Sequence, residues 1–223
     1  MIRQRTAVLR ALLLLVALVA TAARADDQVQ APVFKEGDFW KFKVVEKPVS
    51  GFSSTAIQYP NGIFTLRYTA RGRMRVQEFV ENKETPLEPG QYRRRILSLL
   101  GLRLPTGSTT TFNRLLPFPF YVGKQWRDSY KPTSFRNKFH SIVNSEVVAE
   151  QQVATQAGNF RALRIEQTTQ AALSYAPSGT SSMPTTRGTY YYCPETKSIE
   201  KYDLVGDNGD ELHIELLEFT PAH

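Results

Sequence analysis

Residues 37–44 read GDFWKFKV and residues 123–130 read GKQWRDSY, and these two stretches contain both tryptophans of the 223-residue chain. In each stretch the tryptophan stands three residues after a glycine and directly before a lysine or an arginine. Apolar and basic residues alternate from Trp40 to Val44, which is typical of a β-strand with one buried face. The two stretches therefore predict two strands, each entered through a glycine turn and anchored by an inward indole, Trp40 or Trp126.

Much of the chain shows the pattern of antiparallel strands joined by tight turns. Residues 64–69 and 73–78 alternate in polarity and predict two adjacent strands. Three further hairpins are predicted where short turn sequences separate apolar runs, at residues 156–159 (QAGN), 194–197 (PETK) and 206–210 (GDNGD). We therefore predict a mainly β fold, an antiparallel curved sheet or open β-barrel built from successive hairpins, with one short helix at residues 91–100.

The beginning of the chain has the layout of a secretory signal peptide. A start with three arginines leads into the apolar run ALLLLVALVA (residues 11–20) and a small-x-small cleavage motif that ends at Ala25. Because a membrane-spanning helix needs about 20 apolar residues, we expect no transmembrane segment. Cleavage near Ala25 would leave an exported, periplasmic or extracellular protein. Residues 26–223 would form a single β-rich domain, with half-repeats starting near residues 34 and 120.

Three motifs in the second half of the chain resemble a known family. They are LLPFPFYVGKQW at residues 115–126, VATQAGNFRA at 153–162 and YYYCPETK at 190–197. They resemble the secreted bacterial β domains of the type called domain of unknown function 3108. The resemblance implies a curved antiparallel sheet in the bacterial envelope and supplies no catalytic residues. Gln156 stands where that family frequently has a proline, and the inserted residues 91–104 leave the middle of the fold open.

The sequence carries no recognisable catalytic or cofactor signature. Cys193 is the single cysteine, so an intramolecular disulfide cannot form, and we expect a buried thiol in a strand. The histidines His140, His213 and His223 do not have the spacing of metal ligands, and no Gly-x-Ser-x-Gly motif is present. We therefore predict a protein that is not an enzyme, with no catalytic residue, no metal and no cofactor.

Positive charge is concentrated between residues 67 and 124. This region holds eleven lysines and arginines and four glutamates, which is an excess of seven positive charges. The formal charge of the whole chain is also +7. For an exported protein the accessible polyanions are lipid headgroups and envelope glycans, so we expect no nucleic-acid partner. Two interpretations stay open, a solvated strand face or a dedicated surface for an anionic partner.

We predict a ligand or partner surface from two segments that precede Trp126, one apolar and one basic. Its residues are Phe118, Phe120, Tyr121, Arg93, Arg94 and Arg95. Together they could form an apolar pocket with a cationic mouth. We therefore predict a non-enzymatic envelope protein that binds a lipid or another apolar ligand in the concavity of its sheet. The oligomeric state stays open.

Two alternative functions remain. The protein could be a structural or assembly subunit of an envelope complex, docked through an exposed apolar patch. It could instead be a hydrolase of envelope polymers that works through His140, His213 or Asp128. Asp128 also breaks the strand pattern, because it takes the position that Phe42 fills in the first stretch. Either the strand bulges or ends there, or a carboxylate faces the interior and requires a partner.

Overall fold

The computed structural model of the protein describes residues 28–47, 61–69, 73–87, 96–103, 113–114, 116–130, 137–175, 179–182 and 185–222. The predicted signal peptide and Arg93 to Arg95 lie outside these residues. The main strands are β1 (Phe39–Lys47), β2 (Gly62–Thr69), β3 (Arg73–Val80), β4 (Lys83–Pro86), β7 (Gln125–Tyr130), β8 (Asn137–Thr155), β9 (Gly158–Tyr175), β10 (Gly179–Ser182), β11 (Thr186–Cys193), β12 (Ser198–Gly206) and β13 (Glu211–Thr220).

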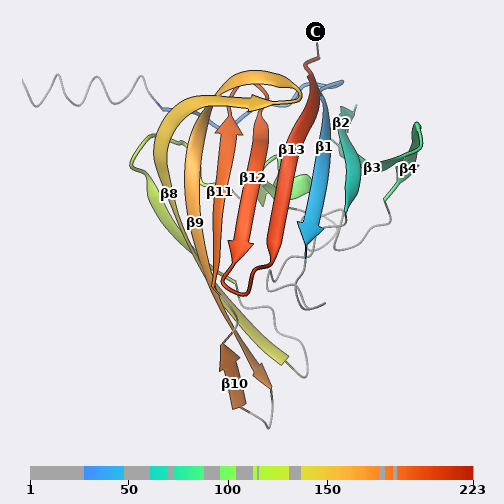
Figure 1. Ribbon diagram of the computed structural model, residues 1–223. Coiled ribbons are helices and arrows are strands. Elements are labelled where there is room, and N and C mark those ends of the chain that lie inside the picture. Colours follow the sequence, from blue (N-terminus) through green and yellow to red (C-terminus); the bar gives the residue numbers. More distant parts are fainter. Residues whose placement is uncertain are drawn as a thin grey trace, which may run out of the picture.

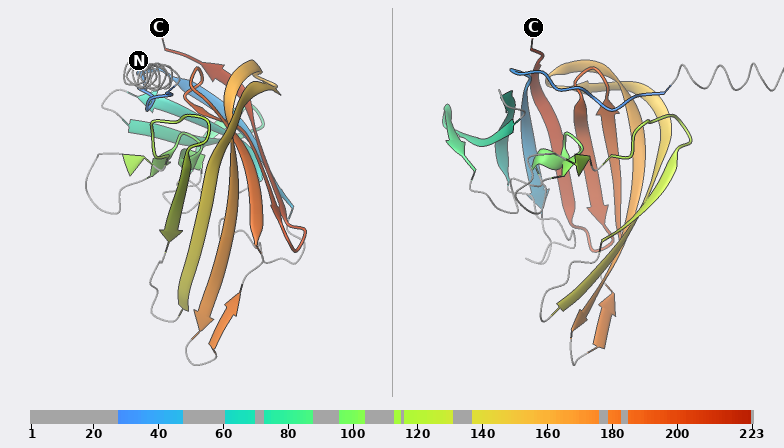
Figure 2. Two further views of the ribbon diagram at one scale, coloured as in Figure 1. Left: turned by 90° about the vertical axis from the view of Figure 1, so that its left-hand side faces the viewer. Right: turned by 180° about the vertical axis from the view of Figure 1, so that it is seen from behind.

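These strands form a single 11-stranded antiparallel sheet that curves around its own core (Figure 1). The order across the sheet is β4-β3-β2-β1-β13-β12-β11-β9-β8-β7, and β10 extends it by pairing with β9. A separate pair, β5 (Leu102–Arg103) and β6 (Asn113–Arg114), lies on the concave side (Figure 2, right). The predicted fold class, a curved antiparallel sheet that stays open, is confirmed.

The predicted hairpins are all present, and one is much longer than its sequence pattern indicates. The turns at residues 194–197 and 207–210 join β11 to β12 and β12 to β13. The third hairpin joins β8, with 19 residues, to β9, with 18. Its tip arches across the ends of β11 and β12 and reaches β13, where Ala157 N donates to Leu216 O at 3.4 Å (Figure 1). The β8–β9 hairpin therefore both widens the sheet and covers one of its ends.

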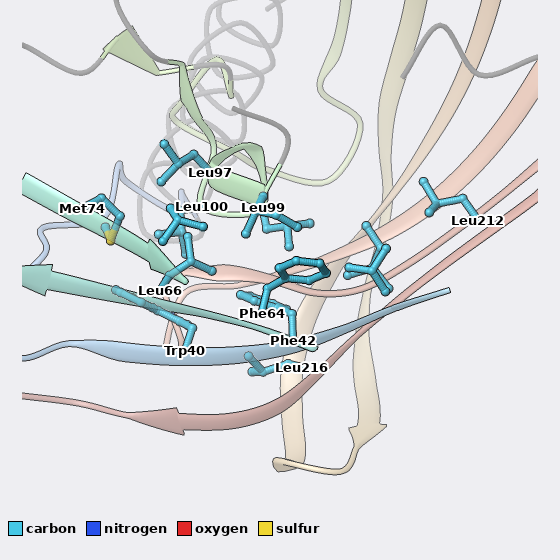
Figure 3. Close-up of a cluster of buried hydrophobic side chains, with 14 of the residues drawn as sticks. Trp40, Phe42, Phe64, Leu66, Met74, Leu97, Leu99, Leu100, Leu212 and Leu216 are labelled. Carbon is cyan, nitrogen blue, oxygen red and sulfur yellow. The ribbon is translucent and has the colours of Figure 1, made fainter. Parts of the chain in front are cut away.

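The first quoted stretch lies at the centre of the larger core. Gly37 has a φ of 98°, and Gly123 in the second stretch has a φ of 90°, as expected for glycine turns before strands. Trp40, Phe42 and Val44 are buried on the inner face of β1, where they pack with side chains of β2, β3 and β13 (Figure 3). The alternation of the sequence thus directly determines which face of β1 is covered.

A short helical turn fills the concave face over this core. Residues 96–98 are helical, with Leu99 N bonded to Ile96 O and Leu100 N bonded to Leu97 O. All four of these apolar side chains are buried (Figure 3 labels the three leucines). The predicted helix at residues 91–100 is therefore described only in its last turn, since residues 91–95 lie outside the described part of the chain.

A buried carboxylate ties distant parts of the chain to the start of β1. Asp38 accepts hydrogen bonds from Lys35 N at 2.7 Å, from Ala222 N at 3.0 Å and from Lys197 Nζ at 2.6 Å. Next to it, the indole Nε1 of Trp40 donates to Thr196 O at 2.6 Å. The entry of β1, the β11–β12 turn and the C-terminal residues are therefore held at one end of the sheet.

Replacing Trp40 with alanine should lower the free energy of unfolding by about 3–5 kcal/mol, because the indole is completely buried. Trp126, which is only partly buried, should show a smaller loss. Chemical denaturation of the two alanine variants measures both effects. Unfolding of Trp40→Ala at the same denaturant concentration as the wild type would contradict the structural role assigned to this indole.

Candidate functional site

The segment predicted to bind an apolar ligand instead forms part of the protein's own interior. Phe120 is fully buried, with its ring 5.6 Å from Trp126 and 5.6 Å from Tyr192, and the ring of Phe118 lies 4.5 Å from it. Lys124 Nζ donates to the carbonyl oxygens of Pro117 and Pro119, which fixes the segment to the start of β7. Phe118 and Phe120 therefore belong to a second core and do not form an open contact surface. The buried residues of this second core are Leu116, Phe120, Val147, Leu163, Ile165, Tyr190, Tyr192 and Ile199.

Tyr121 behaves differently from its two predicted companions. Its side chain is 43% exposed and the next residue, Val122, is 54% exposed. Arg93, Arg94 and Arg95 lie outside the described residues, so the predicted cationic mouth stays a prediction. The structure thus brings Phe118 and Phe120 together in the core and leaves Tyr121 at the surface.

Part of the predicted basic region is an outward-facing surface. Arg67 on β2 lies directly opposite Arg75 on β3, and both are exposed, as is Arg73. The Arg67 guanidinium lies 4.7 Å from the centre of the Phe39 ring, and none of these arginines forms a described ion pair. This surface is therefore positively charged, and no acidic side chain among the described residues forms an ion pair with its arginines. Like charges directly opposite each other on neighbouring strands reduce stability.

A hollow of about 500 Å³ lies across three neighbouring strands at the other side of the sheet. Its lining comes from β7, β8 and β9 and consists of Gln125, Trp126, Arg127, Asn144, Ser145, Glu146, Glu166 and Thr168. This volume is in the range of small-molecule sites, and all lining residues except Trp126 have polar side chains. The lining includes amide, hydroxyl, carboxylate and guanidinium groups, all of which form hydrogen bonds.

The strand register explains how these polar side chains converge. Arg127, Asn144 and Thr168 form one row across the three strands, and Gln125, Glu146 and Glu166 form the next row on the same face. Side chains on one face of a strand are about 6.5–7 Å apart, and neighbouring strands are about 4.8 Å apart. Six polar groups therefore surround a patch the size of one or two sugar rings on the outer face.

Between the two outer rows lies a third row, whose side chains face the interior and hold the three strands in place beneath the hollow. Trp126, Ser145 and Gln167 occupy it, and Trp126 packs into the second core. Gln167 Nε2 lies 3.4 Å from Ser145 Oγ, while Gln167 Oε1 accepts a hydrogen bond from Tyr202 at 3.3 Å. The polar outer rows therefore stand on a sheet whose inner side is fixed by packing and hydrogen bonds.

Two charged groups of the hollow are available for a ligand. Arg127 and Glu146 form no ion pair within the described residues, whereas Glu166 is paired with Arg164. Arg127 is exposed and Glu146 is half-buried. A donor and an acceptor of opposite charge therefore face a polar hollow at the edge of the sheet.

Asp128 needs no buried partner. Strand β7 continues through it without a register shift, and Asp128 is exposed even though its charge acts on Tyr190 on the inner side. Burial is the main factor that raises the pKa of Tyr190, and the Asp128 charge adds to it. The predicted bulge or strand end at Asp128 is therefore wrong. The carboxylate lies on the same face as Trp126, but it requires no buried partner because it is exposed to solvent.

The residues proposed for a hydrolase do not converge. His140 lies on β8 and Asp128 on β7, but His213 lies on β13, with β12, β11 and β9 between it and β8. The His213 ring is hydrogen-bonded on the outer face instead, with Nδ1 2.8 Å from Asp203 and Nε2 3.2 Å from Glu211. Among the described residues, no group of three or more His, Cys, Asp or Glu side chains is arranged to hold a metal ion.

Comparison with known proteins supports the fold. A crystal structure described as "a putative lipoprotein from Parabacteroides distasonis" matches 87% of this chain and 100% of its own, with a TM-score of 0.50 and 13% identity. A "putative exported protein with YmcC-like fold" from Bacteroides fragilis matches 86% of this chain and 99% of its own, with a TM-score of 0.39 and 10% identity. The first likeness shows a shared β fold.

No family model matches the chain, and neither does any curated protein. The resemblance to domain of unknown function 3108 therefore stays a prediction. None of the helical residues in the described part of the chain forms a segment long and apolar enough to cross a membrane.

His213 should titrate above its ordinary pKa of 6.5, because the hydrogen bond to Asp203 favours the charged ring, although partial burial opposes this. The stabilising effect of this charge is fully present below the ordinary pKa and is lost as the pH rises through the folded-state pKa. An NMR titration of the imidazole measures the shift, and Asp203→Asn should reduce it. A His213 pKa at or below 6.5 in the wild type would show that the Asp203 contact does not form.

Proposed function

We propose that the protein is an exported, non-enzymatic binding protein of the bacterial envelope, and that its ligand is a saccharide or a similar polyhydroxyl compound held in the β7–β9 hollow. The observation that carries this proposal is the convergence of six polar side chains in two rows on one face of three strands. Sugar hydroxyls both donate and accept hydrogen bonds, and this lining offers both kinds of partner.

A polar ligand is better supported than a lipid. The concave face, where an apolar ligand was expected, is occupied by the buried leucines of residues 97–100 and by Phe120. A lipid would have to displace these side chains, and truncating or expelling large core residues costs about 2–5 kcal/mol each. A ligand in the polar hollow displaces only water.

Export is supported by the signal-peptide pattern before Ala25 and by the fold shared with a protein described as a putative lipoprotein. Membership of the family called domain of unknown function 3108 is part of the same proposal and rests on the three quoted motifs. An envelope location would give the hollow access to glycans.

Isothermal titration calorimetry of the mature protein with a panel of envelope oligosaccharides tests the proposal. We expect at least one saccharide to bind, and the double variant Arg127→Ala/Asn144→Ala to weaken its binding more than tenfold. Each lost hydrogen bond contributes about 0.5–1.5 kcal/mol, or up to about 3 kcal/mol when one group is charged, and about 1.4 kcal/mol corresponds to tenfold.

Arg75→Ala is the matched control, because it removes an exposed arginine from β3 on the opposite side of the sheet. It should leave saccharide binding unchanged. Fatty acids and phospholipids form the parallel panel. Binding of lipids alone, or equal weakening by the control, would reject the hollow as the ligand site.

A second candidate, an assembly subunit, is favoured by the adjacent exposed side chains of Tyr121 and Val122. Apolar groups exposed side by side are typical of protein contact surfaces. Crosslinking in cells followed by purification would capture a defined envelope protein from the wild type but not from Tyr121→Ser/Val122→Ser. Capture that is unaffected by these substitutions would argue against docking through this surface.

A further inference from the structure

The most unusual titratable group of the described chain is Glu200 near the start of β12. Its side chain is fully buried, and its carboxylate oxygens have no hydrogen-bond partner within normal distance and angle, although the Cys193 thiol and the Thr196 hydroxyl lie close enough to favour its charged form. A buried carboxylate without partners is costly, so such groups are uncommon in folded proteins. Neither the predicted fold nor the saccharide hollow requires it.

Glu200 lies at an irregular point of the β11–β12 pairing. Tyr191 pairs with Lys201 and Tyr192 pairs with Ile199, so the register shifts around Glu200 and leaves it without an opposing residue on β11. Such an extra residue in one strand is a β-bulge, a feature that redirects side chains. The Thr196 hydroxyl in the adjacent turn is already 3.1 Å from Ser198 Oγ, with which it forms a hydrogen bond.

Cys193 links Glu200 to the hairpin that covers this end of the sheet. The buried thiol packs against Val153 on β8 and Ala162 on β9, and it also influences the ionisation of Glu200. The hairpin tip is fastened to β13 by Gln156 N, which donates to Glu215 Oε1 at 3.0 Å, and by the longer bond from Ala157. The tip of the hairpin is therefore held to β13 by these two hydrogen bonds.

The groups that face Glu200 do not compensate a negative charge. Burial raises the pKa of its carboxyl to about 7, the Cys193 thiol and the Thr196 hydroxyl oppose this shift, and the charge of Glu195 adds to it. Around the neighbouring Cys193, the hairpin contributes the apolar side chains of Val153, Ala162 and Phe160. No cation acts on Glu200 from the described parts of β8, β9, β11 or the turn.

We propose that Glu200 makes the tip of the β8–β9 hairpin a pH-dependent cap, which is closed while the carboxyl is protonated and lifts to hydrate the carboxylate when it ionises. The proposal is independent of the saccharide site. In the closed form the group is buried beneath the hairpin, and in the open form it reaches water. Ionisation therefore favours the open form.

The pH range follows from the two forms. An open cap gives Glu200 its ordinary pKa of about 4.5, and the closed cap raises it to about 7. Closure is therefore unaffected below about pH 4.5, weakens as the pH rises to about 7, and changes no further above that. The difference of about 2.5 pKa values corresponds to an increase in the open population of about 300-fold.

Hydrogen exchange of the mature protein, followed by mass spectrometry, tests the cap. Peptides from residues 149–162 are compared between the wild type and Glu200→Gln at the same pH, so the intrinsic pH dependence of exchange cancels. At pH 8 the wild-type hairpin should exchange more than 100-fold faster than the variant. At pH 5 the two should agree within about fivefold, because the carboxyl is then protonated in the closed form and the pH is only about half a unit above its pKa in the open form.

Two further variants complete the test. Glu195→Gln removes a neighbouring exposed carboxylate that contributes least to the Glu200 shift, so it should retain a pH dependence that is only slightly smaller, whereas Glu200→Leu should lack it, as Glu200→Gln does. Equal exchange of wild type and Glu200→Gln at pH 8 would overturn the proposal, and so would a difference of the same size at pH 5. Unfolding of both Glu200 variants at pH 5 would also overturn it, since the carboxyl would then be required by the closed structure itself.

Discussion

The ion pair between Asp38 and Lys197 is the contact on which the arrangement of the protein depends. It joins residues 159 positions apart, and Asp38 is completely buried. Burial acts to raise the pKa of Asp38, but the hydrogen bonds from Lys197, Ala222 and Lys35 outweigh it and hold the pKa below its ordinary value. The carboxylate thus fixes the β11–β12 turn to the entry of β1, the same turn that receives the indole of Trp40.

The end of the sheet that is held by Asp38 and Lys197 also contains the start of β12. The turn held by Lys197 continues into β12, where Ser198 is hydrogen-bonded to Thr196 and Glu200 is fully buried. Phe120 and the helical turn at residues 96–98 pack their apolar side chains into the two cores on the concave side. On the outer face, the described residues form the β7–β9 hollow and the surface of exposed arginines on β2 and β3.

The fold was predictable because its signals are local. Glycine turns, alternating residues around Trp40 and the PETK and GDNGD turns are each encoded within a few residues, and the structure places them as expected. The hollow was not predictable, since Arg127, Asn144 and Thr168 come together only through the register of three strands. The burial of Phe120 depends likewise on Tyr192, a contact between distant residues. Glu200 stands in an ordinary strand pattern, and nothing in its local sequence indicates that its side chain is fully buried.

A double-mutant cycle on Asp38 and Lys197 tests the central claim most directly. The free energy of unfolding is measured at pH 7 for the wild type, Asp38→Asn, Lys197→Met and the double variant. A buried, hydrogen-bonded charge pair that holds this end of the sheet predicts a coupling energy of about 1–3 kcal/mol. Effects that add to within about 0.5 kcal/mol would contradict the claim, because the two residues would then contribute to stability independently of each other.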